Sequence, residues 1–435
     1  MANTLFFKQL ENNERKVSWK DILSESLKKH TIQDRHQLLA VGTFSRPVDE
    51  HNMLNSWRKP WLWARVALIG LLFIVMLFVS WYIADKQFVF LAMLFALVPL
   101  VVPLIEMVFF WELNIPQNIS IWDMLLFFLF GGLLSIFFSL LISPSVPEGA
   151  IYAPLAEEPG KLFATLAIIA YLIKKRNIKI YGITALAVGA AVGAGFSGFE
   201  SIMYGVISVI EGEVNGLLLY GSLSYGLSEG MHTVFLRALL AVGGHVQFVA
   251  PYAAASALGI MKGPLSGFKK PGFWIAFLLS CCFHALWNGM DLLVNTEAEY
   301  WVGLIILIIA MWIHILYWVR KCMKEVVRIG TTAAPSINSI RWLTGPFAGS
   351  ITTVLGDAVR IGRAPDNHVV FPSNTAGVSR KHCILRSTNS LSIEDVGSSN
   401  GTFIDGKKIP LNTVCSLHTG QKVSLGSRDN TFLVI

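Results

Sequence analysis

Charged residues and cysteines are both scarce in this chain. Lys, Arg, Asp and Glu make up 14% of its 435 residues, while hydrophobic residues make up 54%. Because soluble domains carry about 25% charged residues, this composition excludes a soluble globular protein as the class of the whole chain. The five cysteines include one adjacent pair, Cys281 and Cys282, but show no spacing typical of a zinc site. We therefore expect free thiols.

The sequence also lacks a visible signal peptide and a single basic patch, which narrows the class of protein. A signal peptide is not visible at the N-terminus, because residues 1–56 are polar and mixed in charge. The net charge of +7 does not form one basic patch, because the lysines and arginines gather at the ends of apolar segments. Such clusters indicate membrane topology rather than nucleic-acid binding. The expected partner is thus a lipid bilayer, and no nucleic acid.

Composition divides the chain into four segments. Residues 1–63 are polar, and residues 64–320 contain apolar runs of about 20 residues, the length that crosses a bilayer as a helix. Residues 321–344 form a linker that changes from basic to small residues. In residues 345–435, Gly and Asn separate short alternating runs, which is typical of a small all-β domain. The predicted fold is a mainly α polytopic membrane bundle followed by a C-terminal β-sandwich.

The number of spans follows from the apolar runs and the basic clusters. Clear candidate spans are 64–84, 88–111, 121–142, 155–173, 181–209, 273–294 and 300–320. The basic clusters 58–65, 174–179, 262–270 and 320–328 share the cytoplasmic side only if residues 212–261 cross an odd number of times. The simplest solution is one span near 244–261, with 214–243 as a re-entrant or outer-face helix. This gives about eight spans with both termini in the cytoplasm; an extra hairpin would give ten.

Ionisable side chains on these segments are the strongest functional candidates, because a charge in hydrocarbon costs several kcal/mol. Glu157 and Glu158 stand together at the start of a predicted span, and Glu200, His245 and His284 lie on later ones. The predicted topology places these groups in the outer half or near the middle of the bilayer, where they can converge. Neighbouring helix positions differ by about 100°, so only one glutamate of the pair is expected to face the histidines.

Helical spacing adds further candidates. Residues four apart share a helix face, which pairs Lys161 with Glu157, Tyr204 with Glu200 and Asn288 with His284. Arg237 precedes His245 by eight residues and is a candidate counter-charge or substrate contact. Small residues before Glu200, such as Gly189 and Gly193, favour a close crossing with another helix.

Carboxylates and imidazoles in one site suit peptide-bond hydrolysis, which needs a polarised water, a base and donors for the oxyanion. They can act directly, or hold a zinc ion that lowers the pKa of water. The residues alone leave both alternatives open.

The membrane region resembles the PrsW family of intramembrane proteases, within the group that contains the CAAX prenyl proteases and bacteriocin-processing enzymes. The resembling motifs are Glu157-Glu158-Pro-Gly-Lys161, Gly198-Phe-Glu200 with Tyr204, Arg237 with His245, and His284-Ala-Leu-Trp-Asn288. The resemblance implies cleavage of membrane-anchored proteins near the extracytoplasmic face of a prokaryotic plasma membrane.

The same resemblance implies roles for the residues. Glu157 or Glu158 would activate the water. Glu200, His245 and His284 would assist it or bind zinc, and His284 with Asn288 would support the oxyanion. Lys161, Tyr204 and Arg237 would support the site. Zinc and metal-free glutamate chemistry both remain open.

Three short motifs follow one another in the C-terminal segment. They are Ile361-Gly362-Arg363, Ser379-Arg380-Lys381-His382 and Asp395-Val-Gly-Ser-Ser-Asn400-Gly401-Thr402. They resemble the forkhead-associated (FHA) domain, a β-sandwich that binds phosphothreonine peptides. The resemblance implies that Arg363 and Ser379 contact the phosphate, Arg380 assists, Asn400 holds the peptide backbone and His382 braces the loops. A phosphothreonine-containing protein is the implied partner, since a phosphate with nearly two negative charges suits such donors.

Two alternatives stand beside a protease with an FHA module. The residues Gly195-Phe-Ser197-Gly198 resemble the nucleophile motif of rhomboid proteases, so Ser197 with His245 or His284 would form a Ser–His dyad. That hypothesis leaves the glutamate pair without a role. The other is a catalytically inactive membrane receptor or scaffold that presents the FHA domain. A transporter is weaker, because the two halves show no matching broken helices.

Overall fold

The computed structural model describes most of the chain. The described residues are 22–43, 53, 57–84, 88–220, 225–259, 261, 263–332, 338–354, 358–387 and 391–435. They belong to two compact units, one within residues 1–331 and the other within 332–435. Each unit has a hydrophobic core of its own.

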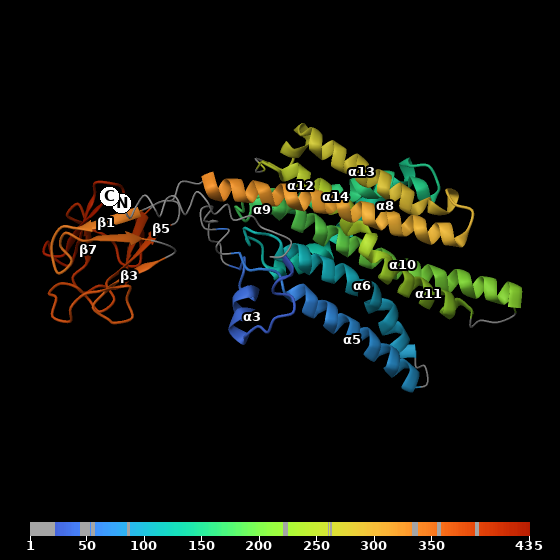
Figure 1. Cartoon of the computed structure of the whole chain (residues 1–435), viewed down its shortest axis with the longest axis horizontal. Helices are drawn as coiled ribbons and strands as arrows, with labels where there is room; N and C mark the ends of the chain where they lie inside the picture. Colours follow the sequence, from blue (N-terminus) through green and yellow to red (C-terminus); the bar gives the residue numbers. More distant parts are fainter. Residues whose placement is uncertain are drawn as a thin grey trace. The chain divides into compact units, whose positions relative to one another are not determined.

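The N-terminal unit is a bundle of long helices (Figure 1). Their bounds are α3 (Ile32–Leu39), α5 (Leu62–Ile83), α6 (Phe88–Glu112), α7 (Ile121–Leu126), α8 (Gly132–Ile142), α9 (Pro154–Lys174), α10 (Gly182–Tyr220), α11 (Tyr225–Leu240), α12 (His245–Ala257), α13 (Pro271–Asn288) and α14 (Glu297–Thr332). A π-helical turn, Phe127–Gly131, joins α7 to α8, and a 3-10 turn, Ala241–Gly243, leads from α11 to α12.

Seven helical segments of the described residues are long and apolar enough to cross a membrane. They are Leu62–Ile83, Val89–Glu112, Ile121–Ser145, Gly182–Asn215, Gly226–Ala257, Pro271–Asn288 and Glu297–Gly330. The helix α9 has 21 residues and carries Glu157, Glu158 and Lys161 within its first turns. Together with α9, these segments agree with the expected count of about eight. The predicted fold class, a helical membrane bundle with a C-terminal β-sandwich, is confirmed.

The structure corrects the prediction for residues 214–261. We expected one span near 244–261 after a re-entrant or outer-face helix at 214–243. Instead, α10 continues to Tyr220, and α11 and α12 together form the single span Gly226–Ala257. Arg237 lies within this span, and its guanidinium pairs with Glu200 on the neighbouring helix. One crossing is still an odd number, so the argument from the basic clusters is unchanged.

Glycines allow α10 and α12 to cross closely. A Cβ atom on Gly193 would lie 2.8 Å from the carbonyl carbon of His245, and one on Gly189 would lie 2.6 Å from the Cβ of Ala253. Backbones therefore touch where larger side chains would hold the helices apart. This crossing sets His245 against α10 two turns before Glu200.

Buried carboxylates satisfy backbone N–H groups at one end of the bundle. Glu112 accepts hydrogen bonds from the N–H groups of residues 61–63 at 2.8, 2.8 and 2.9 Å, and so caps the start of α5. Glu325 accepts from the N–H groups of Gly182 and Gly259. The first N–H groups of a helix lack intrahelical partners, so these acids have a structural explanation.

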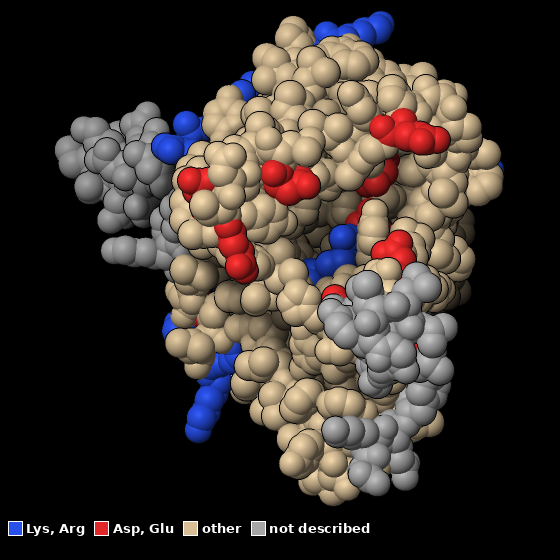
Figure 2. All heavy atoms as spheres, turned by 90° about the vertical axis from the view of Figure 1, so that its right-hand side faces the viewer, with Lys and Arg blue, Asp and Glu red and all other residues tan. Residues whose placement is uncertain are grey.

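The opposite end of the bundle is acidic and hollowed. Figure 2 faces this end, with acidic side chains around a hollow in which basic side chains are visible. The exposed acids here, among the described residues, include Glu148, Glu211, Asp291, Glu297 and Glu299. Described basic residues such as Arg65, Lys174 and Lys269 lie at helix ends on the other side of the bundle.

The C-terminal unit is a sandwich of two sheets (Figure 1). The strands are β1 (Asn338–Trp342), β2 (Ile351–Val354), β3 (Val359–Gly362), β4 (Val369–Val370), β5 (Cys383–Ser387), β6 (Leu391–Asp395), β7 (Thr402–Ile404), β8 (Lys407–Lys408), β9 (Val414–Ser416), β10 (Lys422–Leu425) and β11 (Thr431–Val434). One sheet has the order β2-β1-β11-β10-β7-β8 and the other β4-β3-β5-β6-β9. Trp342, Ile361 and Phe432 are fully buried in its core.

A buried carboxylate fixes the loop after β6. Asp395 accepts hydrogen bonds from the N–H groups of Gly397 and Ser398 at 3.1 and 2.7 Å, and from the hydroxyls of Ser398 and Thr402 at 2.7 and 2.8 Å. Burial disfavours the charged form, but these hydrogen bonds outweigh it and hold the pKa of Asp395 below its ordinary value. The ionised carboxylate is therefore part of the fold.

Acid is expected to destabilise the C-terminal unit through Asp395. A carboxyl whose pKa is lower in the folded state stabilises fully above its unfolded pKa of about 3.9 and loses this contribution as the pH falls through the folded pKa. Asp395→Asn should lower the free energy of unfolding at pH 7 by about 1–3 kcal/mol and flatten its dependence on pH below about 4. Denaturant unfolding at several pH values measures both. Asp429→Asn, at an exposed acid, is the control; equal pH profiles for the two variants would contradict the prediction.

Candidate active site

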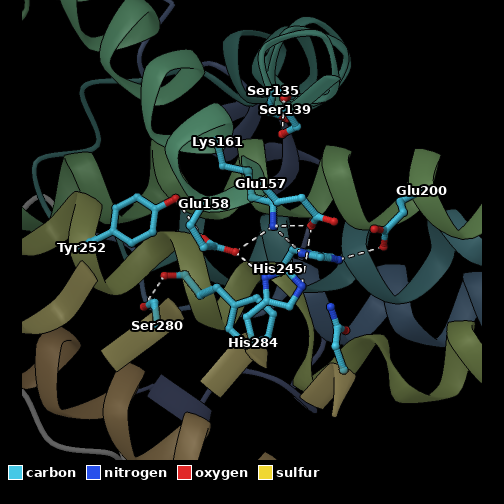
Figure 3. A network of polar contacts seen from close by, with 12 residues as sticks. Ser135, Ser139, Glu157, Glu158, Lys161, Glu200, His245, Tyr252, Ser280 and His284 are labelled. Carbon is cyan, nitrogen blue, oxygen red and sulfur yellow. Dashed lines mark hydrogen bonds and ion pairs between the residues drawn. The ribbon is translucent and has the colours of Figure 1, made fainter. Parts of the chain in front are cut away.

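Four helices bring the five predicted ionisable residues together (Figure 3). Glu157 and Glu158 lie in the first two turns of α9, Glu200 lies on α10, His245 begins α12, and His284 is near the end of α13. The contacts between α9, α10, α12 and α13 thus assemble one polar cluster inside an apolar bundle.

Glu158 is at the centre of this cluster and is fully buried. Its Oε1 lies 2.8 Å from Nζ of Lys161 and 2.8 Å from Nδ1 of His284. Its Oε2 accepts a hydrogen bond of 3.4 Å from the hydroxyl of Tyr252. Both oxygens have partners and no exposed surface, so Glu158 is suited to holding its neighbours in place.

Glu157 differs from Glu158 because it reaches the surface of the site. Its side chain is 16% exposed, and its Oε2 lies 3.2 Å from Nζ of Lys161 and 3.6 Å from Nε2 of His284. We expected only one of the two glutamates to face the histidines. Both do, because His284 presents one ring nitrogen to each carboxylate.

Glu200 forms a second group with His245. Its Oε2 lies 3.0 Å from Nε2 of His245 and 2.5 Å from Nη2 of Arg237. The guanidinium of Arg237 in turn lies 4.3 Å from the ring centre of Tyr204. Arg237 therefore balances the charge of Glu200 from α11, and Tyr204 packs against Arg237.

The hydrogen-bond partners of His245 indicate which of its ring nitrogens carries the proton. A carboxylate only accepts and an ammonium only donates. In His245, Nε2 therefore donates to Glu200, while Nδ1 accepts from Lys161 at 2.8 Å. In His284, Nδ1 donates to Glu158, and Nε2 lies 3.6 Å from Oε2 of Glu157.

Three of these residues form a group that could hold a metal ion. One ligand atom from each of Glu157, His245 and His284 lies within 4.8 Å of the others. We expected Glu200 with the two histidines, but the structure puts Glu157 in this group and Glu200 on the far ring nitrogen of His245. A carboxylate in that position orients a ligating histidine.

Two other candidates lie outside the cluster. Asn288 is half-buried, and its Nδ2 donates to the carbonyl of Ala150 at 2.9 Å, so it ties the end of α13 to the turn before α9. Ser197 is buried. Both ring nitrogens of His245 contact other groups, and those of His284 face the two glutamates. The Ser–His dyad hypothesis therefore has no support in these contacts.

Sequence reasoning missed some polar residues of the bundle interior. Tyr252 is fully buried, and its hydroxyl contacts Glu158. Gln247 donates to Glu106 at 2.6 Å, two residues after His245. Glu106 is an acid within an apolar span and could have been found by that criterion. Tyr252 carries no such signal, because a tyrosine in an apolar run is typical of core packing.

The residues predicted to bind a phosphopeptide line one groove of the sandwich. They are Arg363, Ser379, Arg380 and Asn400. Nε of Arg363 donates to the carbonyl of Val378 at 2.5 Å, and Oγ of Ser379 accepts from the N–H of Ser399 at 2.9 Å. Nδ2 of Asn400 donates to the carbonyl of Gly377 at 3.1 Å. These bonds join the loops that form the groove.

His382 lies beneath this groove. It is fully buried, and its Nδ1 accepts a hydrogen bond of 3.0 Å from the N–H of Ser379. Burial lowers the pKa of His382 below its ordinary value, so the neutral ring is favoured. The neutral ring can accept this bond, which positions Ser379.

Comparison with known proteins identifies both units. A family model of the PrsW family intramembrane metalloproteases matches residues 58–319, more than half of the chain. The chain belongs to the PrsW family. A model of the FHA domain matches residues 359–426. The recognition of a PrsW-type membrane region followed by an FHA domain is therefore confirmed.

Individual relatives match about a quarter of the chain. The ABC transporter ATP-binding/permease protein Rv1747 of Mycobacterium tuberculosis is 38% identical over 107 residues, which are 24% of this chain and 12% of that protein. The chain thus spans about an eighth of the length of this curated relative. An FHA domain of an Arabidopsis thaliana hypothetical protein is 29% identical, with 22% of this chain and 82% of that chain covered and a TM-score of 0.21. The FhaA FHA domain, in a complex with the intracellular domain of Rv3910, is 22% identical. The match covers 22% of this chain and 99% of that chain, with a TM-score of 0.20.

The description of the PrsW family implies a metal ion, and the residues present fit one. The two histidines and Glu157 supply nitrogen and oxygen donors of the kind that zinc takes in catalytic sites. Each histidine has its other nitrogen on a carboxylate, Glu200 or Glu158, as expected behind a metal ligand. The site could therefore hold a metal ion through Glu157, His245 and His284.

Proposed function

We propose that this PrsW-family protein is an endopeptidase that cleaves membrane-anchored proteins at the cluster around Glu157. The observation that carries the proposal is the meeting of Glu157, His245 and His284 within 4.8 Å inside an apolar bundle. Charged and polar groups in a membrane interior are costly and are usually functional. A packing role explains one such residue more easily than a set from three helices.

Glu157 is the proposed base. Among the glutamates of α9 it has the exposed side-chain surface, so water can reach its carboxylate. Glu158 and Glu200 hold His284 and His245 so that Nε2 of His284 and Nδ1 of His245 face the inner side of the cluster. A metal ion, when bound there, would lower the pKa of a water molecule and polarise the substrate carbonyl.

Charge supports a cleavage site near the extracytoplasmic face. The site lies toward the acidic end of the bundle, since Glu157 is on the first turn of α9 and His284 is four residues from the end of α13. Basic clusters gather at the opposite end, and lysine and arginine favour the cytoplasmic side. With this orientation, both chain ends and the FHA domain are in the cytoplasm of a prokaryotic cell.

The FHA domain is proposed to bind a phosphothreonine-containing protein through its groove. The donors of Arg363 and Arg380, with the hydroxyl of Ser379, line the same groove as Asn400. Such a set suits a doubly charged phosphate and the backbone of a peptide. The domain would then recruit a phosphorylated partner to the membrane protease.

Cleavage of a single-span substrate tests the protease. In vesicles that contain the full chain, His284→Ala should lower the cleavage rate by about a hundredfold or more, because general acid–base residues contribute at least that much. The control is His232→Ala, at an exposed histidine of α11. Mass spectrometry of the products locates the cut bond. Equal rates for both variants would contradict the proposal, and a chain that cuts no single-span substrate would favour the inactive scaffold.

A further inference from the structure

Lys161 is a buried cation at the centre of the cluster. Its side chain is 0% exposed, and Nζ lies 3.2 Å from Glu157 Oε2, 2.8 Å from Glu158 Oε1 and 2.8 Å from His245 Nδ1. An ammonium has three N–H donors, so these contacts use all of them. Figure 3 shows the three partners around the end of the lysine side chain.

The partners of Lys161 overlap with the metal-binding group. Glu157 and His245 belong to both, and Nδ1 is the ring nitrogen of His245 with an available lone pair. One lone pair cannot serve an N–H donor and a metal ion together. Glu158 is the remaining partner of Lys161 and lies outside the metal-binding group.

We propose that Lys161 is a built-in cation that competes with a metal ion for Glu157 and His245. This inference rests on the proposed function, because it concerns the same site. A metal ion binds when the ammonium gives up these two contacts and keeps Glu158. The ring of Phe196, whose centre is 4.1 Å from Nζ, offers a further surface that attracts a cation.

Lysine in this position has two consequences. The single charge of Lys161 offsets one of the two charges of Glu157 and Glu158 without a metal, which stabilises the cluster before metal binding. Lys161 also lowers the affinity of the two histidines and the glutamate for a metal ion. Metal binding must displace the Lys161 ammonium from two contacts and place two positive charges near each other. Lys161 thereby tunes how readily the site is loaded.

Metal affinity, not activity, tests this inference. The full chain is purified in detergent and treated with a chelator, and Zn²⁺ is titrated against a chromophoric competitor. Lys161→Met keeps the length of the side chain and removes its charge, so it should bind Zn²⁺ at least about tenfold more tightly. Lys174→Met, at an exposed lysine at the end of the same helix, should not change the affinity.

A second pair of variants guards against misfolding. Lys161→Met leaves Glu158 short of a partner, so Glu158→Gln is also compared with the double variant Glu158→Gln/Lys161→Met; the double variant should again bind about tenfold more tightly. Unchanged or weaker affinity after loss of Lys161, in both backgrounds, would overturn the inference, and so would the absence of Zn²⁺ binding in all variants. The His284→Ala cleavage assay still judges the proposed protease separately.

Discussion

Glu157→Gln is expected to lower the rate of substrate cleavage by at least about a thousandfold. Glutamine has the same size but neither takes a proton from water nor gives a metal ion a charged ligand, and both losses act on the same step. Glu157 is partly exposed, so its replacement should leave the bundle folded. The measurement is the initial rate of cleavage of a single-span substrate in vesicles, together with the melting temperature of the purified variant.

Glu158→Gln is the matched comparison, because it changes the neighbouring residue in the same way. Glu158 is fully buried and contacts Lys161, His284 and Tyr252. Removing one partner of a buried ion pair costs about 3–5 kcal/mol, so this variant should lose stability as well as activity. The roles assigned to the pair would be refuted by an active Glu157→Gln variant, or by an inactive Glu158→Gln variant as stable as the parent protein.

Much of the membrane fold could be predicted from apolar length and basic clusters. At residues 214–261 the basic clusters require an odd number of crossings but do not show where the crossing begins. Arg237 is paired with Glu200 at 2.5 Å, and pairing makes its place in a span tolerable. The two residues are 37 positions apart in the sequence, so an inspection of short sequence segments does not detect the pair.

The site could be predicted as a set of residues but not as an arrangement. Burial cost identifies Glu157, Glu158, His245 and His284 from their types alone. Burial cost does not tell which carboxylate orients a histidine and which belongs to the metal-binding group. That depends on the rotation of each helix about its own axis. The same limit explains why Lys161, placed beside Glu157 by spacing, also reaches His245, which is 84 residues away.

Arg363→Ala is expected to weaken binding of a phosphothreonine peptide by about a hundredfold. A charge-assisted hydrogen bond contributes about 1.5–3 kcal/mol, and arginine can offer two of them to one phosphate. In the structure, Nε of Arg363 donates to the carbonyl of Val378 and Nη1 to that of Ser373, and all three residues line the groove. Fluorescence anisotropy with a phosphothreonine peptide library measures the loss, with unphosphorylated peptides as the reference.

A matched variant separates a phosphate contact from a general effect of positive charge. Arg360 lies on β3, the strand that ends just before Arg363. Its side chain is exposed and does not line the groove. Arg360→Ala removes the same charge, so at a salt concentration that screens exposed charges it should change the affinity less than about twofold. If Arg363→Ala and Arg360→Ala weakened binding equally, the groove would attract phosphopeptides by overall charge, and the assignment of Arg363 to the phosphate would be wrong. A loss confined to Arg363→Ala, and absent for unphosphorylated peptides, ties the phosphate to this side chain.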